Sequence, residues 1–193
     1  MLRVTLSLSA ILFLAAPVLA QSTAPVRDAG ATTLPADATV RLPAEVGTLL
    51  GAVRPVGRGT LRWFGLRVYD ATLWSAESAF APDRAFALEL RYSRDIPRER
   101  LLNSTVSEMR RLGQSDDAKV ARWRELLVPI FPDVREGDRL IGVHLPGRGA
   151  AFFDAQRRIG VIEDAEFARW FFAIWLDAGT REPSLRAALL GTP

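Results

Sequence analysis

GRGTLRWFGLRVYDATLW, residues 57–74, is the stretch that decides the fold of this chain. It is dense in aromatic and β-branched residues, which favour β-strands, and its three glycines mark places where a turn or a bulge can form. With a period of two, large apolar side chains point to both faces: Leu61, Trp63 and Tyr69 to one, and Phe64, Leu66 and Val68 to the other. A strand that is apolar on both faces is typical of the buried centre of a sheet. The pattern therefore predicts a central strand covered on both sides.

Polar side chains are interleaved with this apolar surface, among them Arg62, Arg67 and Asp70. A buried polar group needs a partner or a ligand, whereas at the rim of a sheet it is simply solvated, and both alternatives stay open. In regular register Arg62 and Tyr69 face opposite sides, and one extra residue at a bulge would bring them to the same side. We predict a bulge at or beside Gly65, with Tyr69 and Arg62 or Arg67 forming the polar end of a largely apolar pocket.

The N-terminus has the pattern of a cleaved signal peptide over residues 1–20. Arg3 precedes an apolar run, and Val18-Leu19-Ala20 supplies the small residues of a cleavage site. The run is shorter than the roughly 20 residues that span a bilayer, so we expect no stable membrane insertion after cleavage. Residues 21–39 are poor in large apolar residues and predict a flexible lead-in, followed by one domain over residues 40–193. The sequence thus predicts an exported, periplasmic protein, which without cysteine has no disulfides.

Composition argues against several classes of function. Only one of the 25 basic residues is a lysine, Lys119, and no dense basic run occurs, so nucleic acid is not expected as a partner. The chain lacks a Gly-rich phosphate loop and a Gly-x-Ser-x-Gly elbow, and one histidine without cysteine cannot form the usual metal spacings. We expect neither a metal nor another cofactor, and no catalytic residue can be assigned from motifs.

The rest of the chain alternates between strand and helix patterns. Phe86 to Tyr92 alternates as a half-buried strand. Apolar residues at helical spacing then predict a helix over residues 98–112. A second helix is predicted from a possible cap at Ser115 to about Ile130. Residues 140–145 and 151–153 form a predicted hairpin, and helices are expected over 164–176 and from Pro183 to Leu190. Two helices in succession after several strands predict an α+β fold, with helices gathered on one side of a mostly antiparallel sheet.

Three further features are candidates for a site, each beside a simpler structural interpretation. Arg91, with the neighbouring Arg94, Arg98 and Arg100, could grip a carboxylate, or the turn could simply be solvated. His144 titrates near neutrality and could act as an acid or base, although a structural histidine is the more common case. Trp170 belongs to an aromatic helix that could line a ligand cavity or be ordinary core.

The motifs together resemble those of a known family. LRWFGLRVYDATLW, then LRYSRDIP, then Gly137-Asp138 before a strand, then FFAIWL and a closing PSLRAALLG, are similar to the bacterial exported branch of the chalcone isomerase-like proteins. The resemblance implies an open-faced β-sandwich, a large antiparallel sheet with helices packed on one face and a cleft between them. The superfamily includes plant enzymes that close a chalcone into a flavanone, fatty-acid-binding relatives, and members without known activity.

At most positions that match the cleft residues of the plant enzymes, this chain has a different residue type. Tyr69 stands where a strand threonine would be, and the other positions fall near Leu61 or Arg62, Leu101, Glu108 and Ala173. We therefore expect a non-catalytic domain that binds a small amphipathic ligand such as a fatty acid, with Arg62, Arg67, Tyr69, Arg91 and Trp170 as candidate ligand-binding residues. The alternatives are an isomerase or intramolecular lyase for a small phenolic or enone substrate, and a periplasmic scaffold.

Overall fold

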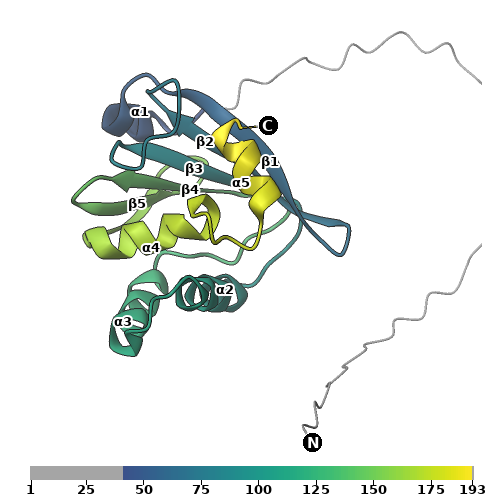
Figure 1. Cartoon of the computed structure of the whole chain (residues 1–193), viewed down its shortest axis with the longest axis vertical. Helices are drawn as coiled ribbons and strands as arrows, with labels where there is room; N and C mark the ends of the chain where they lie inside the picture. The colour runs from purple at the N-terminus through teal and green to yellow at the C-terminus, as the bar shows by residue number, and fades with distance from the viewer. Residues whose placement is uncertain (1–40, 193) are drawn as a thin grey trace, which may run out of the picture. The chain divides into compact units, whose positions relative to one another are not determined.

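A computed structural model describes residues 41–192, which form one antiparallel sheet with five helices (Figure 1). The predicted signal peptide and the whole of the predicted lead-in therefore lie outside the described residues. The six strands pair in chain order, each with the next. They are β1 (Arg54–Trp63), β2 (Leu66–Ser75), β3 (Phe86–Tyr92), β4 (Arg139–Leu145), β5 (Gly149–Phe153) and β6 (Arg158–Ile162).

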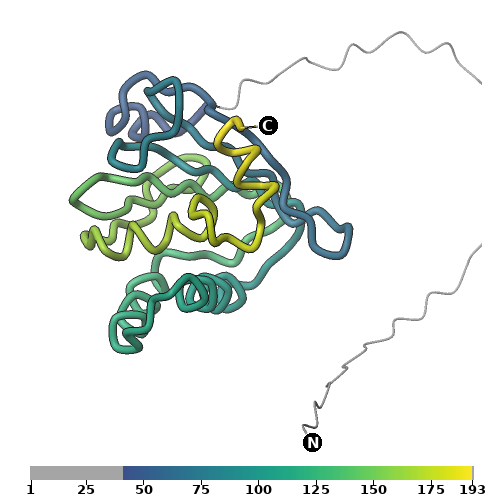
Figure 2. Tube along the Cα trace, in the orientation of Figure 1, coloured from purple at the N-terminus to yellow at the C-terminus, as the bar shows by residue number. Residues whose placement is uncertain are grey.

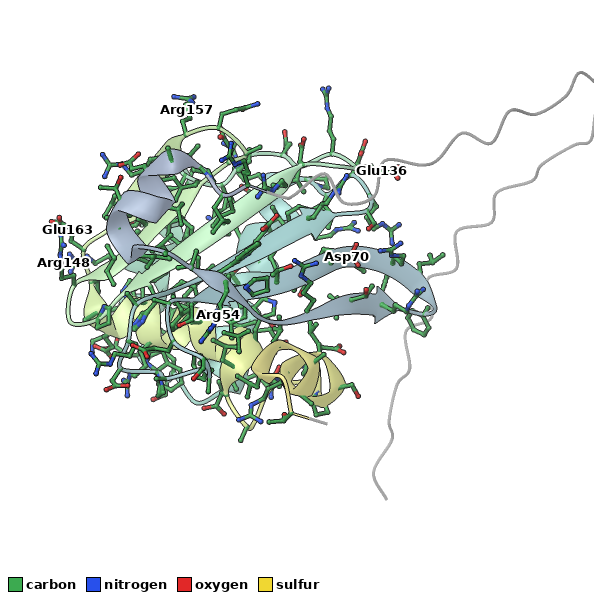
Figure 3. All side chains as sticks on the ribbon, turned by 90° about the horizontal axis from the view of Figure 1, so that it is seen from above. Arg54, Asp70, Glu136, Arg148, Arg157 and Glu163 are labelled. Carbon is green, nitrogen blue, oxygen red and sulfur yellow. The ribbon has the colours of Figure 1, made fainter. Side chains whose placement is uncertain are left out.

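The helices cover the two faces of the sheet unequally. They are α1 (Ala44–Leu50), α2 (Arg98–Arg111), α3 (Asp117–Leu127), α4 (Ala165–Leu176) and α5 (Pro183–Leu190). Figure 3 shows α1 on one side of the sheet and α4 and α5 on the other. The predicted α+β architecture, a large antiparallel sheet with helices packed on one face, is confirmed, with α1 as an addition on the opposite face.

The stretch from residue 57 to residue 74 is a β-hairpin, so the prediction of one central strand was wrong. Among the described strands β1 is at the edge of the sheet and pairs with β2 alone, with Phe64 and Gly65 as the two residues of the turn between them. Both turn residues have positive φ, 47° and 78°, as in the type I′ turns that match strand twist. The sequence pattern predicted continuous alternation instead of a turn here. The turn has no clear signal in the sequence, because a bulky Phe is an unusual residue in this backbone conformation.

The predicted bulge is displaced from Gly65. Pairing along the hairpin shifts between Leu61↔Tyr69 and Arg62↔Arg67, which leaves Val68 as the extra residue on β2. The irregularity is therefore within β2, beyond the turn, and it does not bring an arginine to the side of Tyr69.

The main core lies between the sheet and helices α2 to α5. Its centre is aromatic: Phe152, Phe167 and Trp123 are almost completely buried, and Phe171 packs edge-on against Phe152 with ring centroids 5.2 Å apart. Asp164 caps α4 as expected, because its carboxylate accepts a hydrogen bond from the Phe167 N–H at 2.9 Å. The cap of α3 is Asp116 rather than the predicted Ser115.

Two elements of the structure were not predicted from the sequence. Helix α1 has only seven residues, and β6 is a five-residue edge strand interrupted by Gly160, so neither repeats a pattern long enough to stand out. Val46 of α1 packs on a second, smaller apolar cluster that contains Trp74, Ile141 and Phe153. Within residues 41–192, no helix is both long and apolar enough to cross a bilayer.

Candidate functional site

A half-open cleft of about 500 Å³ lies between α4 and one end of the sheet. Its floor is formed by Phe86 of β3 and Phe172 of α4, whose rings meet edge-on with centroids 5.0 Å apart. Phe80, in the loop between β2 and β3, contributes a wall and packs edge-on against Phe86. The lining is mostly apolar, and the volume falls in the range of small-molecule sites. We call this site the α4 cleft.

Polar groups are few and stand at the edges of the α4 cleft. They are His144, Arg169, Asp83 and Asp177. Arg169 is exposed, its guanidinium lies 5.2 Å from the centroid of the Trp170 ring, and it forms no ion pair with any residue in the described part of the chain. An apolar cleft with an uncommitted cation at its rim can hold an amphipathic molecule that ends in an anionic group.

His144 is built into the wall of the α4 cleft. Its ring stacks on Phe86 with centroids 4.8 Å apart, and its Nδ1 lies 3.3 Å from the Arg84 carbonyl oxygen, to which it donates. Burial lowers the pKa of His144 below its ordinary value of 6.5, against a smaller opposing effect of the hydrogen bond. The neutral imidazole therefore belongs to the apolar wall at neutral pH.

The lowered pKa of His144 predicts a pH dependence of stability. The unfolded chain takes up the proton near pH 6.5, whereas the folded chain takes it up only at lower pH, so protons favour unfolding. We expect the free energy of unfolding to fall as the pH drops below about 7, and to fall less steeply in His144→Gln. Urea unfolding of both proteins over this pH range measures the difference, and identical slopes would contradict the prediction.

A second depression lies on the opposite face of the sheet and is strongly polar. It has a volume of about 360 Å³ and is lined by residues of β1, β2 and β3, including Arg67, Asp70 and Arg91. Asp70 is engaged on two sides: it pairs with Arg67 at 2.5 Å and accepts a hydrogen bond from Thr60 at 2.6 Å. The pKa of Asp70 is lowered, first by the hydrogen bond from Arg67. The charges of this depression are thus largely satisfied within the protein.

The structure separates the five residues that the sequence singled out. Tyr69 faces the helices, where its hydroxyl accepts a hydrogen bond from Trp175 Nε1 at 2.9 Å. Burial raises the pKa of this hydroxyl, so it is protonated at neutral pH. Arg67 and Arg91 line the depression on the opposite face, and Arg62 lies at the end of the hairpin. The expectation that Tyr69 and Arg62 or Arg67 form one polar pocket end was therefore wrong.

Trp170 is the fifth of these residues, and it lies beside the cleft rather than in it. Its neighbours in the sequence, Arg169 and Phe172, line the α4 cleft, while the Trp170 ring lies toward Gly113 at the end of α2. Its Nε1 is buried without a hydrogen-bond partner among the described residues. The aromatic helix does wall a cavity, as one of the two alternatives suggested, but through a different set of its side chains.

Sequence reasoning missed most of the cleft residues. Arg169 and Phe172 are three positions apart on α4, a spacing that places them on one face of the helix and that could have been noted. Phe80 and Asp83 lie in a loop without a motif. Among residues 41–192, no cluster of histidine and acidic side chains is suited to hold a metal ion.

The fold and the α4 cleft define a class of protein: an open antiparallel sheet, covered by helices on one face, with a ligand-sized apolar cleft under one helix. A sequence model of chalcone isomerase-like proteins matches residues 57–191. The chain therefore belongs to the chalcone isomerase-like family. No curated protein matches the sequence.

Solved structures support the same fold. The crystal structure of an Arabidopsis thaliana fatty-acid binding protein superimposes with a TM-score of 0.57 at 12% sequence identity. The match covers 72% of this chain and 87% of that chain. At this identity the likeness is one of fold.

Proposed function

We propose that this protein is a non-catalytic carrier that binds a small amphipathic ligand, such as a fatty acid, in the α4 cleft. The observation that carries the proposal is an apolar, half-open cavity with a cation at its rim, Arg169, that forms no ion pair with any of residues 41–192. The hydrocarbon chain would cover Phe86 and Phe172, and the carboxylate would face the guanidinium. The fold shared with a plant fatty-acid binding protein supports the same class of ligand.

The aromatic floor of the cleft explains why the ligand should be apolar over most of its length. Phe172 is buried at its base yet contributes to the cleft surface, and Ala168 and Ala173 leave room above it on the same helix. Covering this surface removes apolar area from water and favours binding by about 25 cal/mol for each Å². The rim charge contributes less, because Arg169 is exposed to solvent.

Calorimetric titration of delipidated protein with dodecanoate, and with dodecanol as its uncharged analogue, tests the proposal. We expect the wild type to bind both and to prefer dodecanoate. Arg169→Gln should weaken dodecanoate by about 1 kcal/mol and leave dodecanol unchanged, since it removes only the exposed charge. Ala173→Trp should fill the cleft and weaken both probes about tenfold or more.

Arg157→Gln provides the matched control. Arg157 is also an exposed arginine, and its guanidinium is only loosely associated with Asp154 at 3.9 Å, outside the α4 cleft. Its substitution should leave both affinities unchanged. Native mass spectrometry and lipid extraction of protein purified from its own host provide a second test. A wild type that is isolated empty and binds neither probe would rule out the carrier function.

The absence of turnover is part of the same proposal. An isomerase that acts on a phenolic or enone substrate would need a donor for a developing oxyanion, and Tyr69 is the residue that the family resemblance brings to that position. Tyr69 is not among the residues that line the α4 cleft, and its hydroxyl lies against Trp175 instead. We expect a panel of chalcones, followed by absorbance, to react at one rate under three conditions: without protein, with the wild type, and with Tyr69→Phe. Acceleration by the wild type alone would establish an enzyme instead.

We also propose that the protein is exported to the periplasm after removal of residues 1–20. The support is the sequence pattern of a signal peptide at the N-terminus. The intact mass of the protein recovered from the host's periplasmic fraction tests the proposal. We expect the mass of a chain that begins at Gln21. Full-length protein in the cytosol would refute the proposed export.

A further inference from the structure

The end of the β1–β2 hairpin carries an exposed apolar surface that neither the core nor the α4 cleft uses. Trp63 is 62% exposed, Phe64 87% and Leu66 59%, the highest values among the large hydrophobic residues of the described chain, 41–192. Figures 1 and 2 show this end of the hairpin extending beyond the rest of the fold. We call residues 62–67 the hairpin tip. Contiguous exposed apolar groups at a protruding point mark an interaction site.

Folding alone does not account for a phenylalanine at the turn. Phe64 has a φ of 47°, a conformation that bulky residues disfavour and that Asn or Gly adopts readily. The Phe64 ring contacts only Trp63 among the aromatic residues, with centroids 4.9 Å apart. The residue is thus unfavourable in its backbone conformation and in its exposure to water. A phenylalanine with this φ and this exposure is explained if its ring is buried when the protein binds a partner surface.

The hairpin tip carries two arginines, Arg62 and Arg67, and no acidic residue. Arg62 donates a hydrogen bond to the Gly65 carbonyl oxygen at 3.2 Å, which holds its guanidinium at the turn. Arg67, on the opposite strand, is paired with Asp70. The turn therefore presents apolar rings beside at least one cation that is free of an acidic partner within the described residues.

The shape and size of the tip favour a lipid bilayer over a protein surface. Three partly exposed side chains offer roughly 400 Å². A stable protein interface buries about 800 Å² on each partner, together with complementary shape. A bilayer needs no such complementarity, because its interface accepts a convex aromatic tip, attracts tryptophan, and binds arginines through anionic head groups.

We propose that the hairpin tip docks the protein on the surface of an anionic lipid bilayer, with Phe64, Trp63 and Leu66 inserted at the head-group level and Arg62 in contact with phosphate groups. This inference goes beyond the carrier function and does not depend on it. The tip and the α4 cleft lie at opposite ends of the sheet, since Phe86 and His144 pair at the end of the strands away from the turn. Docking would therefore leave the mouth of the cleft free.

Flotation of ligand-free protein with vesicles tests the proposal. Wild type should float with phosphatidylglycerol–phosphatidylcholine vesicles, and binding should weaken at high salt and with phosphatidylcholine alone. Phe64→Asn should reduce vesicle binding about tenfold or more, because it removes the aromatic ring that enters the bilayer. The same variant should unfold at the same or a higher urea concentration, since Asn-Gly suits this turn. Loss of binding therefore cannot be attributed to misfolding.

Two controls make the outcome decisive. Leu126→Ser removes an exposed leucine on α3, 38% exposed and away from the hairpin, and should float like wild type. Arg62→Gln should weaken binding about fivefold, and only to anionic vesicles. Wild type that stays in solution with every vesicle would overturn the proposal. So would sedimentation that reveals a dimer lost in Phe64→Asn, because the tip would then be covered by a second copy of the chain.

Discussion

Replacing Glu89 by alanine should lower the free energy of unfolding by about 3–5 kcal/mol, the largest effect expected of a single substitution here. Glu89 lies in β3 and is only 3% exposed. Its carboxylate accepts a hydrogen bond from Arg139 Nε at 2.6 Å and another from Trp74 Nε1 at 3.0 Å. Alanine would leave both donors, one of them charged, buried without their acceptor.

The geometry around Arg139 makes the loss harder to relieve. The Arg139 side chain is 15% exposed, and its Nη2 has no hydrogen-bond partner among the described residues even in the intact protein. Its Nη1 is held at the Arg41 carbonyl oxygen, 3.2 Å away. The guanidinium therefore cannot turn freely toward water when Glu89 is removed. We therefore expect the unpaired guanidinium to destabilise the folded state by the full amount given above.

Urea unfolding of a small set of variants measures this prediction. Glu99→Ala removes the partner of Arg124 in a pair whose glutamate is 61% exposed, and should cost less than about 1 kcal/mol. The double variant Glu89→Met with Arg139→Met should recover most of the lost stability, since replacing both members of a buried pair by apolar residues is often neutral. A loss in Glu89→Ala no larger than in Glu99→Ala would contradict the prediction.

Replacing Gly57 by alanine should destabilise the fold by about 3 kcal/mol, at the upper end of the usual cost of overpacking. A methyl group at Gly57 would overlap the carbonyl oxygens of Ala188 and Leu189 in α5. Both obstacles are backbone atoms, which cannot change rotamer, so α5 would have to move away from β1. Figure 2 shows how closely this helix passes along the edge strand.

Gly47→Ala is the control with the opposite expected sign. Gly47 lies inside α1, and an added Cβ would meet nothing within 4 Å. Alanine should therefore stabilise the protein by up to about 1 kcal/mol through helix propensity alone. Unfolding of both variants in urea compares them directly. If Gly57→Ala were as stable as the wild type, α5 would not be held against β1 as the structure places it.

Local patterns in the sequence were sufficient for much of the fold. Asp164 as a cap, the aromatic spacing of α4, and the Pro-Gly turn between β4 and β5 all follow from interactions within a few residues, so they could be predicted without tertiary information. The order of the strand and helix patterns predicted the mostly antiparallel sheet, and the family resemblance implied the same fold. Short elements such as α1 lacked this local signal, because seven residues make few contacts of their own.

The candidate site could be predicted only in part, for a different reason. Period-two alternation assigned Tyr69 to a face relative to its neighbours, but the turn at Phe64 and the extra residue Val68 decided that Arg62 and Arg67 do not share that face. The α4 cleft joins a loop, two strand ends and a helix that are far apart in the sequence, and no motif links Phe80 to Arg169. Its existence depends on long-range packing.

The sequence by itself determined the class of fold, the capped start of α4 and the aromatic character of the core, because these depend on residue type and short-range spacing. Only the tertiary structure decided that the aromatic stretch from residue 57 to residue 74 folds back on itself. It also decided that Phe64 and Trp63 lie in water while Tyr69 faces Trp175. The physical reason is that burial is a property of the assembled chain: the same apolar residue is core or surface depending on what packs against it.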